Sequence, residues 1–419
     1  MAAQGAAAGG DFDRMWSALL PIGRHAASGG YRRYAWTAAD AALREWFAGE
    51  ASARGLDLTA DRAGNQWAWW GDPDRSGFAD RGAVDAGRGV AVGSGRGVAV
   101  GSHLDSVPDG GAFDGPLGVV SAFAAVDALR ERGFVPSVPL GVVNFGDEEG
   151  ARFGVACAGS RIITGALDPD RARGLRDADG VSLADAMAAA GHHPEHLGRD
   201  AETLRRVGTF VELHVEQGRR LVELDRPVAV GASIWPHGRW RLDLVGEANH
   251  AGTTALADRR DPMLDLAAVV LAARRAAEAR DCLATVGKVR VEPNGVNAIA
   301  ARVTAWLDAR GPVAAEVRSV AEAVAAAAGT GAVEESFTDE TSFDPALTAQ
   351  LSTLVVGAPL MGTGAGHDAG ILALAGVSAA MLFVRNPTGV SHSPAEHAER
   401  SDCLAGVAAL TEVLADLCR

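Results

Sequence analysis

Residues 97–133 read GVAVGSHLDSVPDGGAFDGPLGVVSAFAAVDALRERG and pass from a short apolar run to a long one through a polar turn. The first run, GVAVGSH, has the length and composition of a buried strand. The long run that starts at Leu117 has the pattern of a helix. A strand that leads directly into a helix is the building unit of an α/β fold.

The same alternation recurs along the chain. Further buried strands are expected at 138–146, 208–216 and 378–385, and Thr37 is the expected N-cap of an amphipathic helix within 36–55. Strands that alternate with helices form βαβ units and a mostly parallel sheet. We therefore expect an α/β main domain whose mostly parallel sheet carries helices on both faces.

Residues 221–338 follow a different order, which is strand, helix, strand, strand, helix, strand (βαββαβ). That order suits a smaller α/β sandwich domain inserted into the main domain. The main domain would then comprise residues 1–220 and 339–419, and the alanine- and glycine-rich residues 1–10 are expected to be a disordered leader.

The composition disfavours several classes of partner. The 419 residues include 39 basic and 53 acidic side chains, a formal net charge of −14 at pH 7, which disfavours nucleic acid and anionic membranes. No signal peptide and no apolar run of about 18 residues are recognised, so no membrane partner is expected. The four cysteines are far apart and lack CxxC spacing, which favours a reduced, cytoplasmic protein.

The eight residues GRGVAVGS occur twice in succession, at 87–94 and 95–102. Only the second copy continues into His103, so chemistry can fix the position of that copy alone. We interpret the first copy as a duplication tolerated in an edge strand or a surface loop. No Lys-Ser/Thr follows the glycines, which excludes a phosphate-binding loop.

Side chains that can bind a metal ion follow four of the expected strands. They are His103 and Asp105 in GSHLDS, Asp114 in GGAFDGP, Glu148 and Glu149 in GDEEGARFG, His214 in ELHVEQG and His392 in GVSHSPAEH. In open α/β sheets, ligands bind beyond the carboxyl ends of the strands. Histidine and carboxylate ligands without thiolate suit Zn²⁺, Mn²⁺, Co²⁺ or Ni²⁺. The sequence therefore predicts a metal centre.

Coordination chemistry suggests the division of roles. Two metal ions about 3.5–4 Å apart need a bridging carboxylate, and Asp114 in its tight turn is the natural bridge. Asp105 could hold the ring of His103 through its second nitrogen. One of the two adjacent glutamates can bind metal while the other acts as general base. Residues Ser393–Glu396 match a capping box, which predicts a helix directly after His392.

Together, GSHLDSVPDGGAFDGPLGV, DEEGARFG, ELHVEQG, GEANHAGTT, NGVNAIA and GVSHSP resemble the M20-type metallo-amidohydrolases, most closely the branch of N-carbamoyl-L-amino acid hydrolases and allantoate amidohydrolases. The resemblance extends from about residue 12 over nearly the whole chain. It implies two divalent ions, zinc foremost and Mn, Co or Ni as alternatives. The implied ligands are His103, Asp114 and His214 for one ion, and Asp114, Glu149 and His392 for the other, with Glu148 as the catalytic base.

The resemblance also implies a set of residues that contact the substrate. Gln217 would lie at the edge of the metal centre, His250 and Asn297 would donate to a developing oxyanion, and Arg310 would bind the substrate carboxylate. His250 would thus be both catalytic and substrate-binding. The inserted domain is expected to act as a lid and to form a homodimer. Whether His250 serves its own or the partner's active site stays open.

Two further motifs receive other interpretations. The loop GHHPEH, with His192, His193 and His196, is interpreted as a surface segment. GAGHDA at 364–369 lacks the acid that a dinucleotide site needs, so we expect close backbone packing there, with His367 supporting a ligand.

The expected activity is hydrolysis of a linear, non-peptide C–N bond in an N-carbamoyl or ureido group on a small carboxylated substrate. Alternatives on the same fold are an aminoacylase or dipeptidase and an N-formyl or N-formimidoyl amino acid hydrolase. A catalytically silent metal-binding relative and a nucleotide-binding oxidoreductase are rivals from other classes.

Overall fold

The computed structural model describes residues 2–74 and 97–419, and the chain forms two compact units. The first unit ends at Ala232 and resumes over Ser342–Met361 and Gly366–Arg419. The second unit comprises Ser233–Thr341 with Gly362–Ala365, so the insertion begins later than the predicted residue 221. The reason is that residues 228–231 still pair with a strand of the first unit's sheet.

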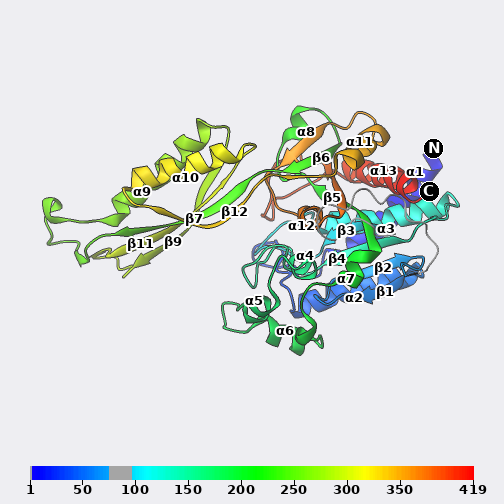
Figure 1. The fold of residues 1–419 in the computed structure, drawn as a ribbon, viewed down its shortest axis with the longest axis horizontal. Helices are drawn as coiled ribbons and strands as arrows, with labels where there is room; N and C mark the ends of the chain where they lie inside the picture. The colour runs from blue at the N-terminus through cyan, green and yellow to red at the C-terminus, as the bar shows by residue number, and fades with distance from the viewer. Residues whose placement is uncertain (1, 75–96) are drawn as a thin grey trace, which may run out of the picture. The chain divides into compact units, whose positions relative to one another are not determined.

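The first unit is built on a nine-stranded sheet whose central strands are parallel (Figure 1). The parallel strands, in spatial order, are β4 (Leu140–Phe145), β3 (Gly97–His103), β5 (Val207–Val215) and β15 (Ser378–Val384). The outer strands are β1 (Asp57–Ala60), β2 (Gln66–Trp70), β6 (Val228–Ile234), β13 (Thr341–Ser342) and β14 (Leu360–Thr363). The predicted fold class, an α/β fold with a mostly parallel central sheet, is confirmed.

Helices cover both faces of this sheet. Val211 and Leu213 of β5 belong to the large apolar core that five helices share, namely α1 (Ala2–Leu19), α2 (Ala38–Ala53), α3 (Pro116–Glu131), α11 (Pro345–Leu354) and α13 (Arg400–Leu417). Glu212, between them, accepts a hydrogen bond from Ala369 in α12 (Asp368–Leu374). Because neighbouring strand residues point to opposite faces, α12 and its neighbour α4 (Ala158–Thr164) lie on the other face.

Two sequence predictions about the helices have different outcomes. Thr37 is the N-cap of α2, and its side chain accepts a hydrogen bond from the backbone of Asp40, as predicted. The structure places residues 2–10 in α1, which begins at Ala2, and the expected disorder of residues 1–10 stays a prediction.

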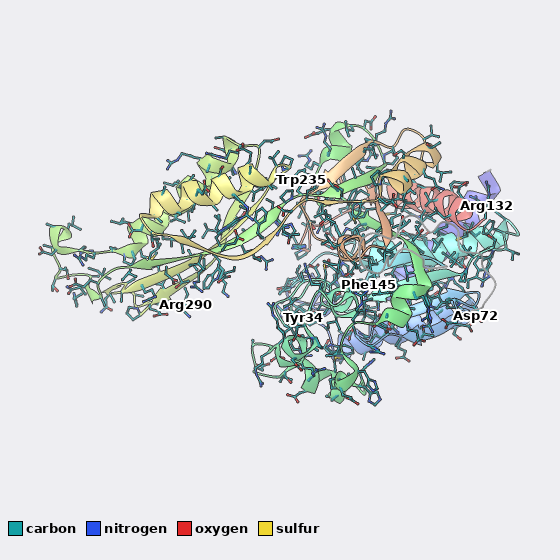
Figure 2. The ribbon with its side chains drawn as sticks, in the orientation of Figure 1. Tyr34, Asp72, Arg132, Phe145, Trp235 and Arg290 are labelled. Carbon is teal, nitrogen blue, oxygen red and sulfur yellow. The ribbon has the colours of Figure 1, made fainter. Side chains whose placement is uncertain are left out.

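The remaining elements of the first unit connect the sheet. They are α5 (Pro169–Gly174), α6 (Leu183–Ala189), η2 (Pro194–His196), α7 (Ala201–Arg206) and α8 (Arg220–Glu223). Phe145 ends β4, and its ring contacts those of Trp67 and Phe210, 5.7 Å from each, so aromatic packing supports this end of the sheet (Figure 2). The second copy of GRGVAVGS supplies β3, whereas the first copy lies outside the described residues.

The second unit has the predicted βαββαβ order. Its elements are β7 (His237–Val245), α9 (Pro262–Glu278), β9 (Leu283–Glu292), β11 (Arg302–Arg310), α10 (Ala314–Ala328) and β12 (Ala332–Thr338). The four strands form one antiparallel sheet in the order β12-β7-β11-β9, and α9 and α10 share its apolar core (Figure 1). A small ladder joins β8 (Asn249–His250) to β10 (Ala298–Ile299), and η3 spans Leu256–Asp258.

Among the described helices, none is long and apolar enough to cross a lipid bilayer.

Candidate metal centre

The predicted metal ligands follow the ends of the four parallel strands. β3 ends at His103, and Glu148 and Glu149 follow β4. His214 is the last residue but one of β5, and His392 lies in the loop after β15. Because parallel strands run in one direction, their carboxyl ends meet at the same edge of the sheet, and these side chains converge there.

His103, Asp114 and His214 form a first group, in which one ligand atom from each lies within 4.8 Å of the others. Nε2 of His214 lies 3.1 Å from Oδ1 of Asp114, and Nε2 of His103 lies 3.6 Å from the same oxygen. All three side chains are buried. Two imidazole nitrogens and one carboxylate oxygen thus border a single small space.

Asp114, Glu149 and His392 form a second group within the same limit of 4.8 Å. Nε2 of His392 lies 3.4 Å from Oδ2 of Asp114 and 3.6 Å from Oε2 of Glu149. Asp114 therefore presents Oδ1 to the first group and Oδ2 to the second. This is the arrangement that a carboxylate needs in order to bridge two cations.

Glu148 lies beside the first group. Its Oε2 is 3.7 Å from Nε2 of His103, and its Oε1 accepts a hydrogen bond from the thiol of Cys157 at 3.2 Å. Glu148 also forms a third possible group with His103 and Glu149. Only Glu149 of the two glutamates reaches His392 within ion-pair distance, and the division between ligand and base stays a prediction.

The hydrogen bonds of the two histidine rings show whether their second nitrogens are available to a metal ion. Nδ1 of His103 is 3.2 Å from the carbonyl oxygen of Asp105, and Nδ1 of His214 is 2.9 Å from that of Val215. A carbonyl oxygen only accepts, so each Nδ1 donates and each neutral ring keeps its lone pair on Nε2. Both Nε2 atoms are buried without a hydrogen-bond partner in the described part of the chain, as is Oε1 of Glu149. Orphaned acceptors of this kind are what a buried metal site requires.

Neighbouring side chains hold the ligands in place. The carboxylate of Asp105 accepts hydrogen bonds from the backbone of Glu148 and Glu149, and its Oδ1 is 3.4 Å from Nδ1 of His103. It therefore orients the glutamate turn, whereas its predicted hold on the ring of His103 stays a prediction, because Nδ1 of that ring donates to the backbone carbonyl of Asp105. The ring of His367 lies 4.5 Å from that of His214, beside the ligand that it was predicted to support.

Gln217 lies beside Asp114 and His392. Its Nε2 donates to Oδ2 of Asp114 at 2.9 Å and is 3.3 Å from Nε2 of His392. Its Oε1 is buried and has no hydrogen-bond partner within the described residues.

The charges of the centre are strongly coupled. Burial raises the pKa of Asp114, but attraction to the three neighbouring imidazoles of His103, His214 and His392 outweighs burial and leaves this pKa well below its usual range. The hydrogen bond to Asp114 raises the pKa of His392 to about 9. Burial raises the pKa of Glu149 to about 7 and that of Glu148 well above its usual range. His392 therefore holds a proton at neutral pH in the metal-free protein, and a cation must displace that proton in order to bind.

The turn that carries Asp114 approaches the histidines closely. Gly115 has a φ of +85°, and a Cβ atom there would lie 2.5 Å from ring atoms of His103. Glycine is required at this position for both reasons, because another residue would be strained and would displace the ring.

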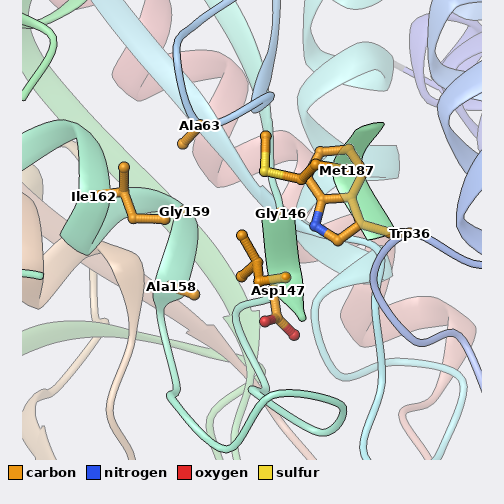
Figure 3. Close-up of a pocket in the computed structure, with 9 residues that line it drawn as sticks. Trp36, Ala63, Gly146, Asp147, Ala158, Gly159, Ile162 and Met187 are labelled. Atoms are coloured by element: carbon orange, nitrogen blue, oxygen red, sulfur yellow. The ribbon is translucent and has the colours of Figure 1, made fainter. Parts of the chain in front are cut away.

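Asp147 and Glu396 are buried carboxyl groups near the centre to which the sequence assigned no site role. Asp147 has a φ of +54°, and its carboxyl oxygens have no hydrogen-bond partner in the described residues. Asp147 also lines a small cavity with Trp36 and Met187 (Figure 3), and burial raises its pKa well above the usual range.

Glu396 is the second of these buried carboxyl groups, and it follows His392 in the chain. The predicted helix after His392 is wrong, since the next helix begins only at Arg400.

The structure explains why the capping pattern misled. The side chain of Glu396 accepts hydrogen bonds from the backbone of Phe113 and Asp114 instead of turning back to its own segment. These partners are 283 and 282 residues away in sequence, so no local pattern could have revealed them.

The remaining predicted residues belong to the second unit. Nδ1 of His250 accepts a hydrogen bond from the backbone of Gly252 at 3.0 Å, so the neutral ring carries its proton on Nε2 and can donate from there. Asn297 directly precedes β10, whose Ala298 pairs with His250, so the two predicted oxyanion donors are neighbours. Both lie in exposed positions.

Arg310 is already engaged within the second unit. Its Nε and Nη2 donate to the two carboxylate oxygens of Asp308 at 2.7 and 3.1 Å, and its Nη1 donates to the carbonyl of Gly364 at 2.8 Å. A guanidinium has five N–H groups, so two remain for a substrate carboxylate. Asp308 therefore orients Arg310, which the sequence did not reveal.

Comparison with known proteins agrees with this geometry. Residues 99–416 match the family "Peptidase family M20/M25/M40". The chain is 36% identical to the N-carbamoyl-L-amino acid amidohydrolase of Geobacillus stearothermophilus, over 95% of this chain and 96% of that protein. It is 34% identical to the allantoate amidohydrolase of Escherichia coli, over 75% of this chain and 80% of that protein.

A solved structure shares the fold over its full length. The hydantoinase/carbamoylase family amidase from Burkholderia ambifaria is 30% identical, covers 98% of both chains and superposes with a TM-score of 0.76. On these matches, the chain belongs to peptidase family M20/M25/M40 and has amidohydrolases among its relatives.

Proposed function

We propose that this protein is a dinuclear metal-dependent amidohydrolase that cleaves the C–N bond of an N-carbamoyl or ureido group on a small carboxylated substrate. The observation that carries the proposal is the position of Asp114, which faces one His/carboxylate group with each oxygen. The names of the relatives, an N-carbamoyl-L-amino acid amidohydrolase and an allantoate amidohydrolase, supply the substrate class.

The proposed ligands are His103, Asp114 and His214 for one cation and Asp114, Glu149 and His392 for the other. Nitrogen and oxygen donors without a thiolate favour Zn²⁺, with Mn²⁺, Co²⁺ or Ni²⁺ as alternatives. Two such cations act as Lewis acids toward a carbonyl oxygen and ease the loss of a proton from water.

The residues of the chain would then divide the remaining work. Glu148 accepts the proton of the attacking water through Oε2 and returns a proton to the leaving nitrogen. Nε2–H of His250 and the amide of Asn297 donate to the oxyanion that develops on the carbonyl. Arg310 binds the carboxylate of the substrate through its two remaining N–H groups. With an N-carbamoyl amino acid and one water, the products are the amino acid, CO₂ and ammonia.

We also propose that the second unit forms a homodimer and acts as a lid, and that the protein works in the cytoplasm. The exposed apolar side chains of α9, among them Leu264 and Leu271, support a partner surface. All four cysteines are buried and free, which suits a reducing compartment. Analytical ultracentrifugation tests the dimer, which a monomer at micromolar concentration would exclude.

A substrate screen tests the proposed activity. N-carbamoyl-L-amino acids, allantoate, N-formyl acids and dipeptides are compared before and after chelation and after metal is restored. Ammonia and amino acid are both followed, because dipeptides and N-formyl acids release no ammonia. We expect ammonia from a carbamoyl or ureido substrate, lost on chelation and regained with metal. Turnover of dipeptides alone, or full activity without metal, would contradict the proposal.

A further inference from the structure

We infer that Glu396 is a positioning residue that joins the Asp114 turn to the His392 loop and thereby sets the affinity of the second group for its cation. The second group is Asp114, Glu149 and His392, so the inference rests on the proposed metal centre. Glu396 would make the Asp114 turn and the His392 loop, which are distant in sequence, act as one site.

The contacts of Glu396 connect the two segments directly. Its Oε2 accepts hydrogen bonds from the backbone N–H of Phe113 at 2.9 Å and of Asp114 at 3.0 Å. Its Oε1 lies 3.1 Å from the hydroxyl of Ser391, the neighbour of His392. The carboxylate of Glu396 therefore holds both the backbone of the bridging ligand Asp114 and Ser391, which precedes the ligand His392. We call these three hydrogen bonds the clamp.

Ser391 contacts both the bridging carboxylate and Glu396. Its hydroxyl is 3.2 Å from Oδ2 of Asp114 as well as 3.1 Å from Oε1 of Glu396, and it has one proton for these two acceptors. A cation on Oδ2 of Asp114 competes with that proton, and the hydroxyl then donates to Glu396. The clamp thus remains satisfied when the second group is loaded.

The packing around Glu396 leaves little freedom. The residue is 5% exposed, and a Cβ atom at Gly111 would lie 2.4 Å from Cβ of Glu396 and 2.3 Å from its Oε2. The glycine therefore lets the turn close onto the carboxylate. No cation of the described residues forms an ion pair with Glu396, so backbone amides and one hydroxyl hold a buried carboxylate beside another one. Such an arrangement stabilises a metal-free fold poorly, whereas a divalent cation on Asp114 offsets it.

The conformation of His392 depends on the clamp more than the conformations of His103 and His214 do. It has a φ of +55°, a left-handed conformation that is unfavourable for a non-glycine residue and persists only when its surroundings enforce it. His103 and His214 lie in strands and bond to carbonyl oxygens through Nδ1. Loss of the clamp should therefore weaken the second group more than the first.

The test is a titration of the chelated full-length protein with Co²⁺, followed by calorimetry, together with metal content after gel filtration. The variants are Glu396→Ala and Gly111→Ala, which break the clamp by different means. Glu396→Gln keeps an acceptor for the backbone amides and serves as the conservative rescue. Glu399→Ala, an exposed acid three residues away, is the matched control.

We expect the wild-type protein, Glu399→Ala and, within about threefold, Glu396→Gln to bind two equivalents alike. In Glu396→Ala and Gly111→Ala the weaker equivalent should lose at least tenfold in affinity, while the tighter one changes less than threefold. Unchanged binding by both variants would overturn the inference alone. Equal loss of both equivalents with a lowered melting temperature of the metal-free variants would also overturn it, because Glu396 would then serve the fold. A wild-type protein that binds fewer than two cations would overturn the proposed function as well.

Discussion

Replacing Glu148 by Gln separates the chemistry of the proposed base from its place in the structure. Gln has the same shape, so the variant opens no cavity, and its side-chain oxygen can still accept from Cys157, as Oε1 does at 3.2 Å. The amide nitrogen then takes the position of Oε2, which is 3.7 Å from Nε2 of His103 and is the atom proposed to accept the proton of water. An amide nitrogen cannot accept that proton. The backbone N–H of Glu148, held by Asp105 at 3.1 Å, is unaffected.

The size of the effect follows from the role. A positioned general base contributes about 10²- to 10⁴-fold, which is about 2.7–5.4 kcal/mol of transition-state stabilisation. We expect kcat on an N-carbamoyl amino acid to fall by that factor while KM changes only a few-fold. The same preparation should retain both cations by mass spectrometry. Glu149→Gln is the comparison, and it should lose one cation because it removes a ligand.

Two results would refute this assignment. A fully metallated Glu148→Gln that turns over near the wild-type rate would show that another group is the base. A Glu148→Gln that loses a cation while Glu149→Gln keeps both would exchange the two roles, since Glu148 also lies within 4.8 Å of His103 and Glu149 through their ligand atoms.

Three further changes have defined outcomes. Gly115→Ala should displace the ring of His103 and lower metal affinity by at least tenfold in calorimetry, because its Cβ would lie 2.5 Å from the ring. Metal binding should release protons below pH 9, since His392 has a pKa of about 9 in the metal-free protein and must lose its proton to bind; the measured enthalpy should therefore depend on the ionisation enthalpy of the buffer. Glu50→Ala should destabilise the protein by about 1–3 kcal/mol in urea unfolding, because the buried Arg54 keeps its ion pair with Asp127 but loses the one with Glu50. The pKa of Glu50 is lowered, since its arginine partners outweigh burial, so this stability is present above the ordinary pKa of 4.5 and lost as pH falls through the folded value.

The sequence predicts the parts of the site that follow from strand direction. His103, His214 and the glutamate pair each follow a parallel strand, and strands of one direction end at one edge, so their convergence needed no knowledge of the third dimension. The order of the second unit could be predicted for a similar reason, since its helices and strands are long and regular.

Features that depend on distant partners could not be predicted. The limit of the second unit depends on the pairing of β6 with β15, which is some 150 residues later in the chain. The sequence around Glu396 fits a helix cap. Only the structure, in which Gly111 approaches the carboxylate of Glu396, shows that this side chain contacts a distant turn instead. The ion pair between Asp308 and Arg310 is different, because the two residues are only two positions apart in β11 and the alternation of side chains along a strand could have indicated it.

The most direct test of the account is an anomalous diffraction map of the zinc-loaded protein at the zinc absorption edge. It should contain two peaks about 3.5–4 Å apart that flank Asp114, one about 2.0–2.2 Å from Nε2 of His103 and of His214, and the other at that distance from Nε2 of His392 and an oxygen of Glu149. A single peak, or two peaks that share no oxygen of Asp114, would contradict it.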